Sequence, residues 1–395
     1  MPISHSVAVA LCVLGSLTGA AQGSNINGEA TYISFSVPGA LGTYPMSINA
    51  SMTVTGYYYV AHVTPTYLRG FVRAADGAIT TFDVGVPFGI EEGTVWTVPE
   101  SINAAGDITG FYQYPPVGPP GDTWGEIAPV EGFLRYADGH TIDIAPNESV
   151  GGDPGGEDFL PIAQPVSIND LDEVVGNAPY LNPISVFTWS VGGLYGVYKD
   201  GISFNKLTLA TAINASGSVV GFSGSTSTPA RGFVLPPDGV AAPVNVPSPA
   251  PQSCAADGTF PEGINAGGTI AGWYVSSTDN CTPANTGGFV MSPDGVFSLF
   301  QPPGMLLALP VGGFGGSLLA PHSISIDQAG DVTGSYTDAG GVEHGFVRNP
   351  YGTLTTFDPP EGNQTTATSI ADGGLVAGYY QYHSGGPAVG FIRIP

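Results

Sequence analysis

Basic residues are scarce in this 395-residue chain. Only eight Lys and Arg stand against 32 Asp and Glu, which gives a formal charge of −24. Nucleic acids and anionic membrane surfaces are bound by clusters of Lys and Arg, so the composition argues against both as partners. The acidic balance favours solubility outside the cell and cationic partners, with calcium left open as an ion.

Long apolar runs are also missing. The longest, at Ser6–Leu17, is too short to span a bilayer and is followed by small residues at Ala21-Gln22-Gly23. This pattern is typical of a secretory signal peptide. We therefore expect residues 1–23 to be removed, residues 24–395 to form one domain, and the protein to be extracellular or periplasmic without membrane insertion.

Cysteine is nearly absent, with three residues in the whole chain. Cys12 lies inside the expected signal peptide, which leaves Cys254 and Cys281. An even pair in an exported protein favours a disulfide, here closing a loop worth about 3 kcal/mol in the chain-entropy model. A metal pair is the alternative, although no His or Cys stands beside them at ligand spacing.

Turn-forming and aromatic residues are abundant instead. Gly and Pro make up about a quarter of the chain, with 59 and 36 residues, and 10% of the residues are aromatic. No long stretch has helical periodicity. Such a composition is typical of short strands joined by many turns, and so of an all-β fold.

One motif, S-I-N-x-x-G-x-Φ-x-G-Φ-Y with Φ apolar, recurs seven times along the chain. Internal repeats of 40 to 50 residues predict propellers or solenoids. The second glycine of the seven copies is Gly56, Gly110, Gly176, Gly221, Gly272, Gly334 and Gly378. Asp327 and Ala371 replace the motif asparagine in the last two copies.

A second element, G-F-Φ-R-x-x-D-G-x-Φ-x-x-F-D, follows most copies of the motif, as at Gly70–Asp83. The third copy is degenerate. Asn before a Gly-containing turn and Asp-Gly between apolar runs are hairpin signals, because Asn and Asp cap turns and Gly accepts positive φ. Each repeat therefore predicts four short antiparallel strands.

The two ends of the chain indicate how the repeats are arranged. The seventh repeat stops after its third strand, at Gly390–Pro395, whereas Ala30–Gly39 at the N-terminus resembles the fourth strand of the sixth repeat at Thr353–Pro360. A chain that begins with the strand its last repeat lacks can close on itself and protect its sheet edges. We predict a monomeric seven-bladed β-propeller with four-stranded blades, closed by the N-terminal strand.

The repeated pattern resembles the bacterial HAF-type extracellular repeat family. The resemblance covers nearly all of residues 30–395. It implies export and a propeller-like repeat fold. It implies no settled activity and no catalytic residues.

Function is expected in the longer connections, which this topology places on one face. An acidic patch with aromatic residues is predicted there, suited to sugar rings or cationic ligands; solvated loops are the alternative. Its candidate binding residues are Trp96, Tyr114, Asp122, Trp124, Glu126 and Asp158.

Four histidines, His62, His322, His344 and His383, fall in connections of the sixth, seventh and first repeats. Neighbouring histidines can bind a metal or form an acid–base pair, so they are the candidate catalytic residues. No spacing motif supports this, and isolated surface histidines are the alternative.

The repeated Arg of the second element, as at Arg73 and Arg348, recurs in most copies. We interpret it as structural and expect it to pair with Asp of a neighbouring strand.

Two classes of function remain open. The first is a secreted propeller that binds a glycan, a surface polymer or a protein, for which the sequence predicts no required cofactor. The second is an extracellular hydrolase or lyase that uses the histidines or acidic residues of the same face. A structural role in a matrix or envelope is a third alternative.

Overall fold

The computed structural model describes residues 30–60, 67–84, 96–113, 130–144, 163–178, 185–191, 196–198, 207–225, 228–237, 239–247, 257–277, 283–305 and 324–395. Every element in these ranges is a β-strand, which confirms the all-β prediction. Within the same ranges, no helix is long and apolar enough to cross a membrane.

The strands form small antiparallel sheets whose strand order follows the chain. One sheet contains β2 (Gly42–Ile48), β3 (Val54–Val60), β4 (Tyr67–Arg73) and β5 (Ile79–Phe82). The next contains β6 (Trp96–Ile102), β7 (Ile108–Gln113), β8 (Val130–Arg135) and β9 (Thr141–Ile144). A third contains β10 (Gln164–Ile168), β11 (Val174–Ala178), β12 (Ser185–Trp189) and β13 (Gly196–Tyr198).

The following eight strands belong to one sheet. They are β14 (Leu207–Ile213), β15 (Val219–Ser225), β16 (Thr228–Leu235), β17 (Ala242–Val244), β18 (Gly258–Ile264), β19 (Ile270–Ser277), β20 (Pro283–Met291) and β21 (Phe297–Phe300). Two antiparallel groups meet here through a single parallel bridge, Ala230↔Gly258. The strands can approach because Gly258 has no side chain: a Cβ there would lie 2.6 Å from the Cβ of Ala230.

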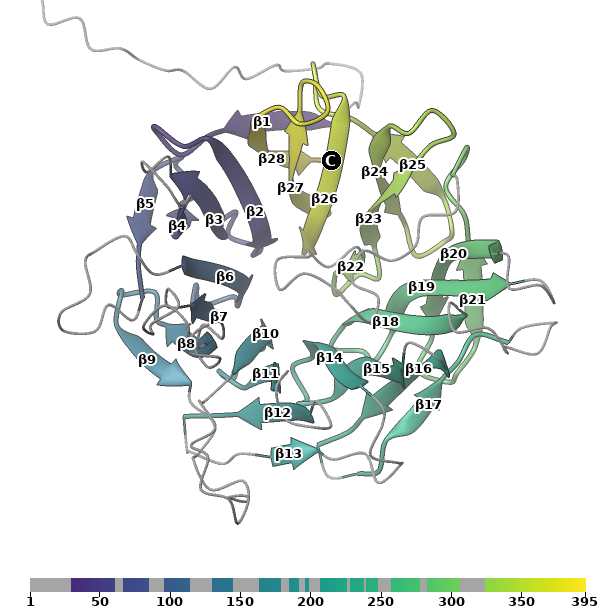
Figure 1. Cartoon of the computed structure of the whole chain (residues 1–395). Coiled ribbons are helices and arrows are strands. Elements are labelled where there is room, and N and C mark those ends of the chain that lie inside the picture. Colours follow the sequence, from purple (N-terminus) through teal and green to yellow (C-terminus); the bar gives the residue numbers. More distant parts are fainter. Residues whose placement is uncertain are drawn as a thin grey trace, which may run out of the picture.

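Two more four-stranded sheets complete the described chain. One contains β22 (Ile324–Ile326), β23 (Val332–Thr337), β24 (Glu343–Arg348) and β25 (Leu354–Phe357). The other has the order β26 (Gln364–Ala371), β27 (Leu375–Gln381), β28 (Ala388–Ile394) and β1 (Thr31–Phe35), so the first strand of the chain pairs with the last. Figure 1 shows the sheets arranged around a common centre, with the first strand of each repeat innermost.

The motif turn joins the first two strands of each repeat. In the first repeat, the N–H of Met52 donates to the carbonyl of Asn49, and the Asn49 side chain accepts from Thr53. The last turn residue has positive φ, which favours glycine, as at Gly217 (φ 80°). Met52 (φ 59°) takes this conformation without being glycine.

The second motif glycine is required by a β-bulge. The register between β2 and β3 shifts between Pro45 and Ser47, opposite Gly56. A Cβ on Gly56 would lie 2.1 Å from the carbonyl oxygen of Tyr44. The same bulge recurs between β14 and β15, where a Cβ on Gly221 would lie 2.0 Å from the carbonyl oxygen of Leu209. The bulge therefore explains why the motif keeps a glycine here.

The core is divided into layers between neighbouring sheets. One layer joins Ile48 and Phe71 of one sheet to Ala377 and Ile392 of another. The Phe of the G-F element is completely buried at Phe71, Phe133, Phe289, Phe346 and Phe391. Side chains from two sheets thus fill each layer, and each sheet needs its neighbours to exclude water.

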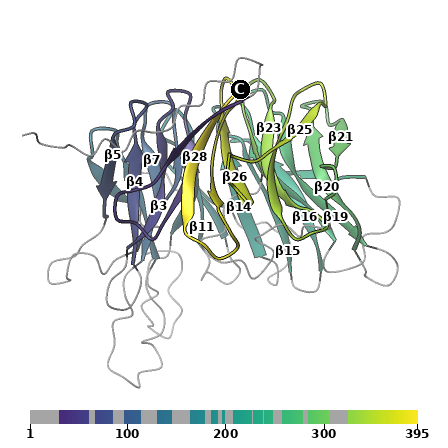
Figure 2. The same ribbon diagram turned by 90° about the horizontal axis from the view of Figure 1, so that it is seen from above.

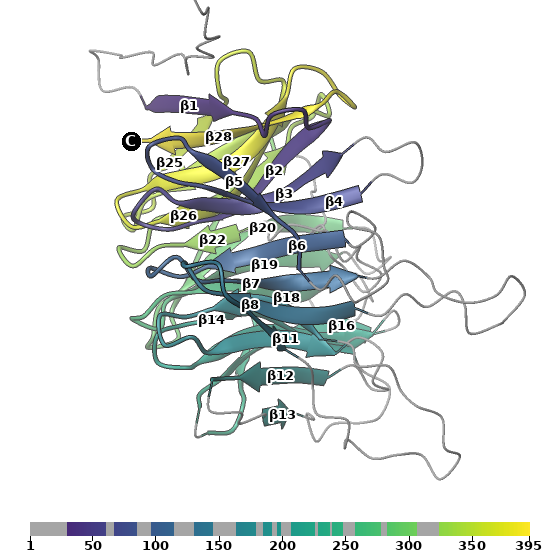
Figure 3. The same ribbon diagram turned by 90° about the vertical axis from the view of Figure 1, so that its left-hand side faces the viewer.

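The tight turns of the repeats, between first and second and between third and fourth strands, gather at one end of the sheets (Figures 2 and 3). We call this end the turn face and the opposite end the connection face. Most residues of the longer connections lie outside the described ranges. In the last two repeats the connection between the second and third strands is short, at residues 338–342 and 382–387.

Candidate functional site

The motif asparagines link neighbouring sheets rather than facing a ligand. The Nδ2 of Asn49 donates to the carbonyl of Asn103 at 3.1 Å, while its Oδ1 accepts from its own turn. The same bond joins Asn103 to Asn169 (3.3 Å), Asn169 to Asn214 (3.0 Å), Asn214 to Asn265 (3.0 Å) and Asn265 to Asp327 (3.1 Å). We call this series the asparagine relay.

The relay ends at Asp327, whose carboxylate has no N–H to donate. Its Oδ1 accepts from the Asp331 N–H at 2.8 Å, but its buried Oδ2 has no partner in the described residues. Burial raises the pKa of Asp327, and the nearby carboxylates of Asp331 and Asp372 raise it further.

The motif serines form a second set of links. Ser47 Oγ accepts from the backbone N–H of Ile102 at 3.3 Å, and Ser369 Oγ accepts from that of Ile48 at 3.4 Å. Three further junctions repeat the contact: Ser101 with Ile168, Ser167 with Ile213 and Ser325 with Ile370. The polar residues of the motif therefore form hydrogen bonds that join one repeat to the next.

The repeated Arg does not pair with Asp of a neighbouring strand, contrary to our expectation. It stacks on the Phe of the fourth strand of the preceding repeat. The guanidinium carbon lies 4.7–5.3 Å from the ring centroid in four pairs: Arg73 with Phe35, Arg135 with Phe82, Arg348 with Phe300 and Arg393 with Phe357. The aromatic face takes the place of the carboxylate that we expected beside the Arg.

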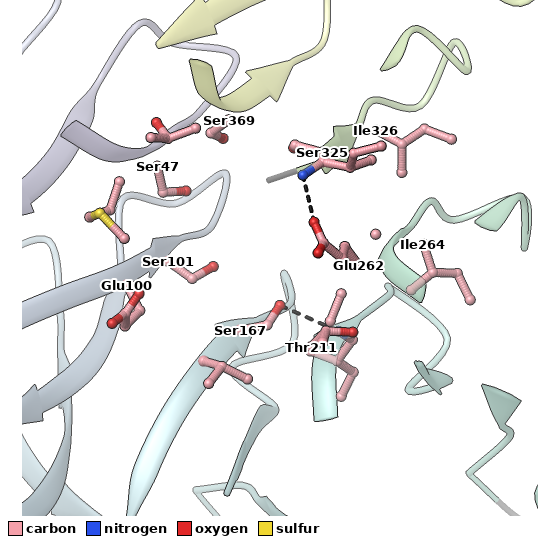
Figure 4. Close-up of a pocket in the computed structure, with 17 residues that line it drawn as sticks. Ser47, Glu100, Ser101, Ser167, Thr211, Glu262, Ile264, Ser325, Ile326 and Ser369 are labelled. Atoms are coloured by element: carbon pink, nitrogen blue, oxygen red, sulfur yellow. Dashed lines mark hydrogen bonds between the residues drawn. The ribbon is translucent and has the colours of Figure 1, made fainter. Parts of the chain in front are cut away.

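A cavity of about 150 Å³ lies at the centre of the sheets, between the innermost strands. Figure 4 shows the motif serines around it, together with Glu100 of β6 and Glu262 of β18 on opposite sides. The residue before the serine position of the motif lines this space in every repeat, and its identity differs between repeats. These residues are Met46, Glu100, Val166, Thr211, Glu262, Ile324 and Thr368, with Ala212 and Gly263 in place of the serine in the fourth and fifth copies.

The two glutamates of the cavity have different surroundings. Glu262 Oε2 accepts from the N–H of Ile324 at 2.6 Å. Glu100 is 6% exposed, and burial raises its pKa well above the ordinary value. A carboxylate held in this way favours a proton or a bound cation.

A cluster of tyrosines lies towards the connection face of the inner strands. Tyr44 stacks on Tyr57 with ring centroids 5.0 Å apart and planes at 10°, and meets Tyr59 and Tyr379 edge to face at 5.2 and 4.9 Å. We call these four residues the tyrosine cluster. Tyr57 is buried, whereas the other three are partly exposed. Trp96 packs against the same hydrophobic core as Tyr44 and Tyr59.

The phenols of the tyrosine cluster remain protonated at neutral pH. Burial raises the pKa of Tyr57 and Tyr379, the latter to about 12. Glu343 lies beside the cluster: the Thr366 side chain interacts with both Glu343 and Tyr379, and burial raises the pKa of Glu343. The cluster therefore presents neutral donors and aromatic faces next to an acidic side chain.

The described histidines do not form a joint site with each other. His344 lies in β24 rather than in a connection, and its Nδ1 is 2.7 Å from Asp358 while its Nε2 is 3.6 Å from Asp338. By strand register it occupies the position of Arg69, which pairs with Asp83 at 2.8 Å. His383 is exposed in the turn after β27, 3.4 Å from the Ser384 carbonyl.

Several expected residues lie outside the described ranges. They are His62, His322, Tyr114, Asp122, Trp124, Glu126, Asp158, Cys254, Cys281 and residues 1–23. Trp96, the described member of the acidic aromatic patch, begins β6 and packs against the hydrophobic core that contains Tyr57. Within the described part of the chain, no group of three or more His, Cys, Asp or Glu could hold a metal.

Comparison with solved structures shows the class of fold. The chain is similar to a catalytically inactive virginiamycin B lyase from Staphylococcus aureus, with a TM-score of 0.51 and 12% identity over 93% of this chain and 100% of the other. It is also similar to a prolyl endopeptidase, with a TM-score of 0.53 and 11% identity over 87% of this chain. This chain spans 47% of that protein, about half its length.

These similarities identify the fold as β-propeller-like. Because the sequence identities are only 11 and 12%, they show the fold and not the function. No family model and no curated protein matches the sequence.

Sequence reasoning missed both the tyrosine cluster and Glu100. A signal for the cluster was present in the Tyr57-Tyr58-Tyr59 run, whose alternate members face the same side of a strand. The signal for Glu100 was a charged residue directly before a motif serine, at a position that faces the centre.

Proposed function

We propose that the sheets are the seven blades of one closed propeller. The seven motif copies, the pairing of β1 with β28 and the contacts of β2 with β26, β27 and β28 support closure. The eight-stranded sheet then counts as two blades joined by the bridge at Ala230. The HAF-type resemblance and the expected signal peptide favour a bacterial protein exported from the cell.

We propose further that this propeller binds an extracellular glycan on its connection face, with the tyrosine cluster as the binding surface. The observation that carries this proposal is the set of partly exposed, mutually supported rings at Tyr44, Tyr59 and Tyr379. Sugar rings stack on aromatic faces through their C–H groups, and such contacts suit rigid aromatic anchors. Neutral phenols and Glu343 offer hydrogen bonds to hydroxyl groups at the edge of the rings.

Binding fits the site better than catalysis by histidine. His344 occupies the same strand position as Arg69 and makes the same kind of pair with the Asp that directly follows the fourth strand, which indicates a structural role. A hydrolase or lyase function remains the second candidate, because the raised pKa values of Glu100 and Glu343 suit carboxyl groups that donate a proton.

The test is a glycan array on the mature protein, followed by calorimetric titration of the best ligand. Tyr44→Ala and Tyr59→Ala should each weaken binding about tenfold, as expected for the loss of an aromatic contact worth about 1.4 kcal/mol. Tyr351→Ala is the matched control, because Tyr351 is 95% exposed in the turn between β24 and β25 on the turn face. It should bind like the parent protein.

Incubation of the bound glycan with the protein separates binding from catalysis. A stable ligand supports a binding protein, and new reducing ends or unsaturated products support the second candidate. Equal affinities for the parent, Tyr44→Ala and Tyr59→Ala proteins would exclude the tyrosine cluster as the binding surface.

A further inference from the structure

The central cavity has the chemistry of a cation site, separate from the tyrosine cluster. The polar groups of its lining carry oxygen atoms that can act as metal ligands. They are the carboxylates of Glu100 and Glu262 and the hydroxyls of the motif serines, Thr211 and Thr368. Among the described residues that line it, there is no Lys, Arg or His. No described residue of the lining therefore places a positive side chain beside Glu100 to balance its charge.

Glu100 is the most informative residue of this lining. It is 94% buried, faces the cavity and makes no hydrogen bond with another described residue. A buried carboxylate without a hydrogen bond or a counter-charge is costly, and proteins usually pair such groups or use them to hold a metal. Glu262 on the opposite side adds a second charge, held in place by the Ile324 N–H.

The size and donor type of the cavity indicate which cation fits. A volume of about 150 Å³ exceeds that of one ion and leaves room for about four waters at roughly 30 Å³ each. Calcium takes six to eight oxygen ligands, including carboxylates and water, and tolerates irregular geometry. The lining has no thiol or imidazole among its described residues, so it does not favour zinc or copper.

We propose that the cavity binds one partly hydrated calcium ion between Glu100 and Glu262. The carboxylates supply the charge, and waters complete the coordination by bridging to the hydroxyls of the motif serines. The ion would connect β6 and β18, which come from repeats on opposite sides of the centre (Figure 4). This inference does not depend on glycan binding.

The experiment begins with mature protein made metal-free with EDTA and titrated with calcium by equilibrium dialysis. One calcium ion should bind per chain. Glu100→Gln and Glu262→Gln should each weaken calcium binding at least tenfold, since Gln keeps the shape and removes the charge. Asp294→Asn, which removes an exposed carboxylate in the turn before β21, is the matched control and should bind like the parent.

Terbium luminescence gives a second readout that does not depend on the glutamate variants. Tyr57 lies close enough to Glu100 for the glutamate charge to affect its phenol, so excitation of Tyr57 should sensitise terbium in the cavity. Tyr57→Phe should lower this emission several-fold without changing calcium affinity. No bound calcium, or full calcium binding retained in both glutamate variants, would overturn the proposal.

Discussion

Replacing Asp327 with Asn should stabilise the protein, because it extends the asparagine relay by one residue. Asp327 already accepts the Asn265 Nδ2 on its backbone carbonyl, as each relay asparagine accepts from its predecessor. Its buried Oδ2 has no partner in the described residues, whereas an amide at this place carries the N–H donor used in the earlier repeats. One added hydrogen bond and the removal of a buried unsatisfied oxygen together predict a gain of about 1–3 kcal/mol in the free energy of unfolding at pH 7.

The pH dependence of this gain gives a stricter test. Burial raises the folded-state pKa of Asp327 above its unfolded value, so the wild-type protein loses stability as the pH rises from the unfolded pKa through the folded one. Below about pH 3.9 the carboxyl is protonated in both states and the difference between Asn and Asp should become small. Urea unfolding at pH 3 and pH 7 measures both values.

Asp76→Asn is the matched control for the relay, because it makes the same chemical change in an exposed Asp-Gly turn. Its effect should stay within about 0.5 kcal/mol at either pH. A loss of stability in Asp327→Asn at pH 7, or a gain of equal size at pH 3 and pH 7, would refute the reasoning about the relay.

Three further predictions concern stability, each measured by urea unfolding. Gly221→Ala should cost about 3 kcal/mol or more, because its Cβ would lie 2.0 Å from the Leu209 carbonyl oxygen in the bulge; a neutral result would show that the bulge can relax. Arg393→Ala should lower the free energy of unfolding by about 1 kcal/mol, because the stack of its guanidinium on Phe357 is lost. Arg231 is exposed, so Arg231→Ala is the control and should lower it by less than about 0.5 kcal/mol. Equal losses in the two variants would show that the stack does not stabilise the protein. In EDTA at pH 7, Glu100→Gln should be about 1–2 kcal/mol more stable than the parent, because the buried charge is removed. Burial raises the folded-state pKa of Glu100, so this gain in stability should vanish below the ordinary Glu pKa of about 4.3, where the carboxyl is protonated in both states. A gain in stability that persists in acid would contradict this prediction.

The repeat pattern predicted the strands well because it states local requirements. An asparagine turn, an Asp-Gly turn and alternating apolar residues act within one hairpin, so their spacing defines four strands without reference to the rest of the chain. The parallel bridge between β16 and β18 depends instead on the close approach of Ala230 and Gly258. Nothing in the repeat pattern marks this contact.

The partner of the repeated Arg shows a second limit of sequence reasoning. A charged residue that recurs beside many Asp residues suggests an ion pair, and charge was the basis of that expectation. The structure places each guanidinium over the Phe of the preceding repeat. The Phe was visible in the same repeated element as the Arg, but only the packing of one sheet on the next makes them neighbours.

The same reasoning explains why the candidate site was harder to predict than the fold. A residue that recurs in most repeats, such as the motif serine or asparagine, serves a contact between neighbouring repeats, so its recurrence points to structure. A single binding or catalytic site needs residues that differ from those at the same position of the other repeats. The position before the serine of the motif is such a place, since it lines the central cavity in each repeat and yet carries Met, Glu, Val, Thr or Ile. In a repeat protein the inward-facing positions that break the pattern are therefore the ones to test for ligands, and here they place both carboxylates of the cavity on opposite sides of one space.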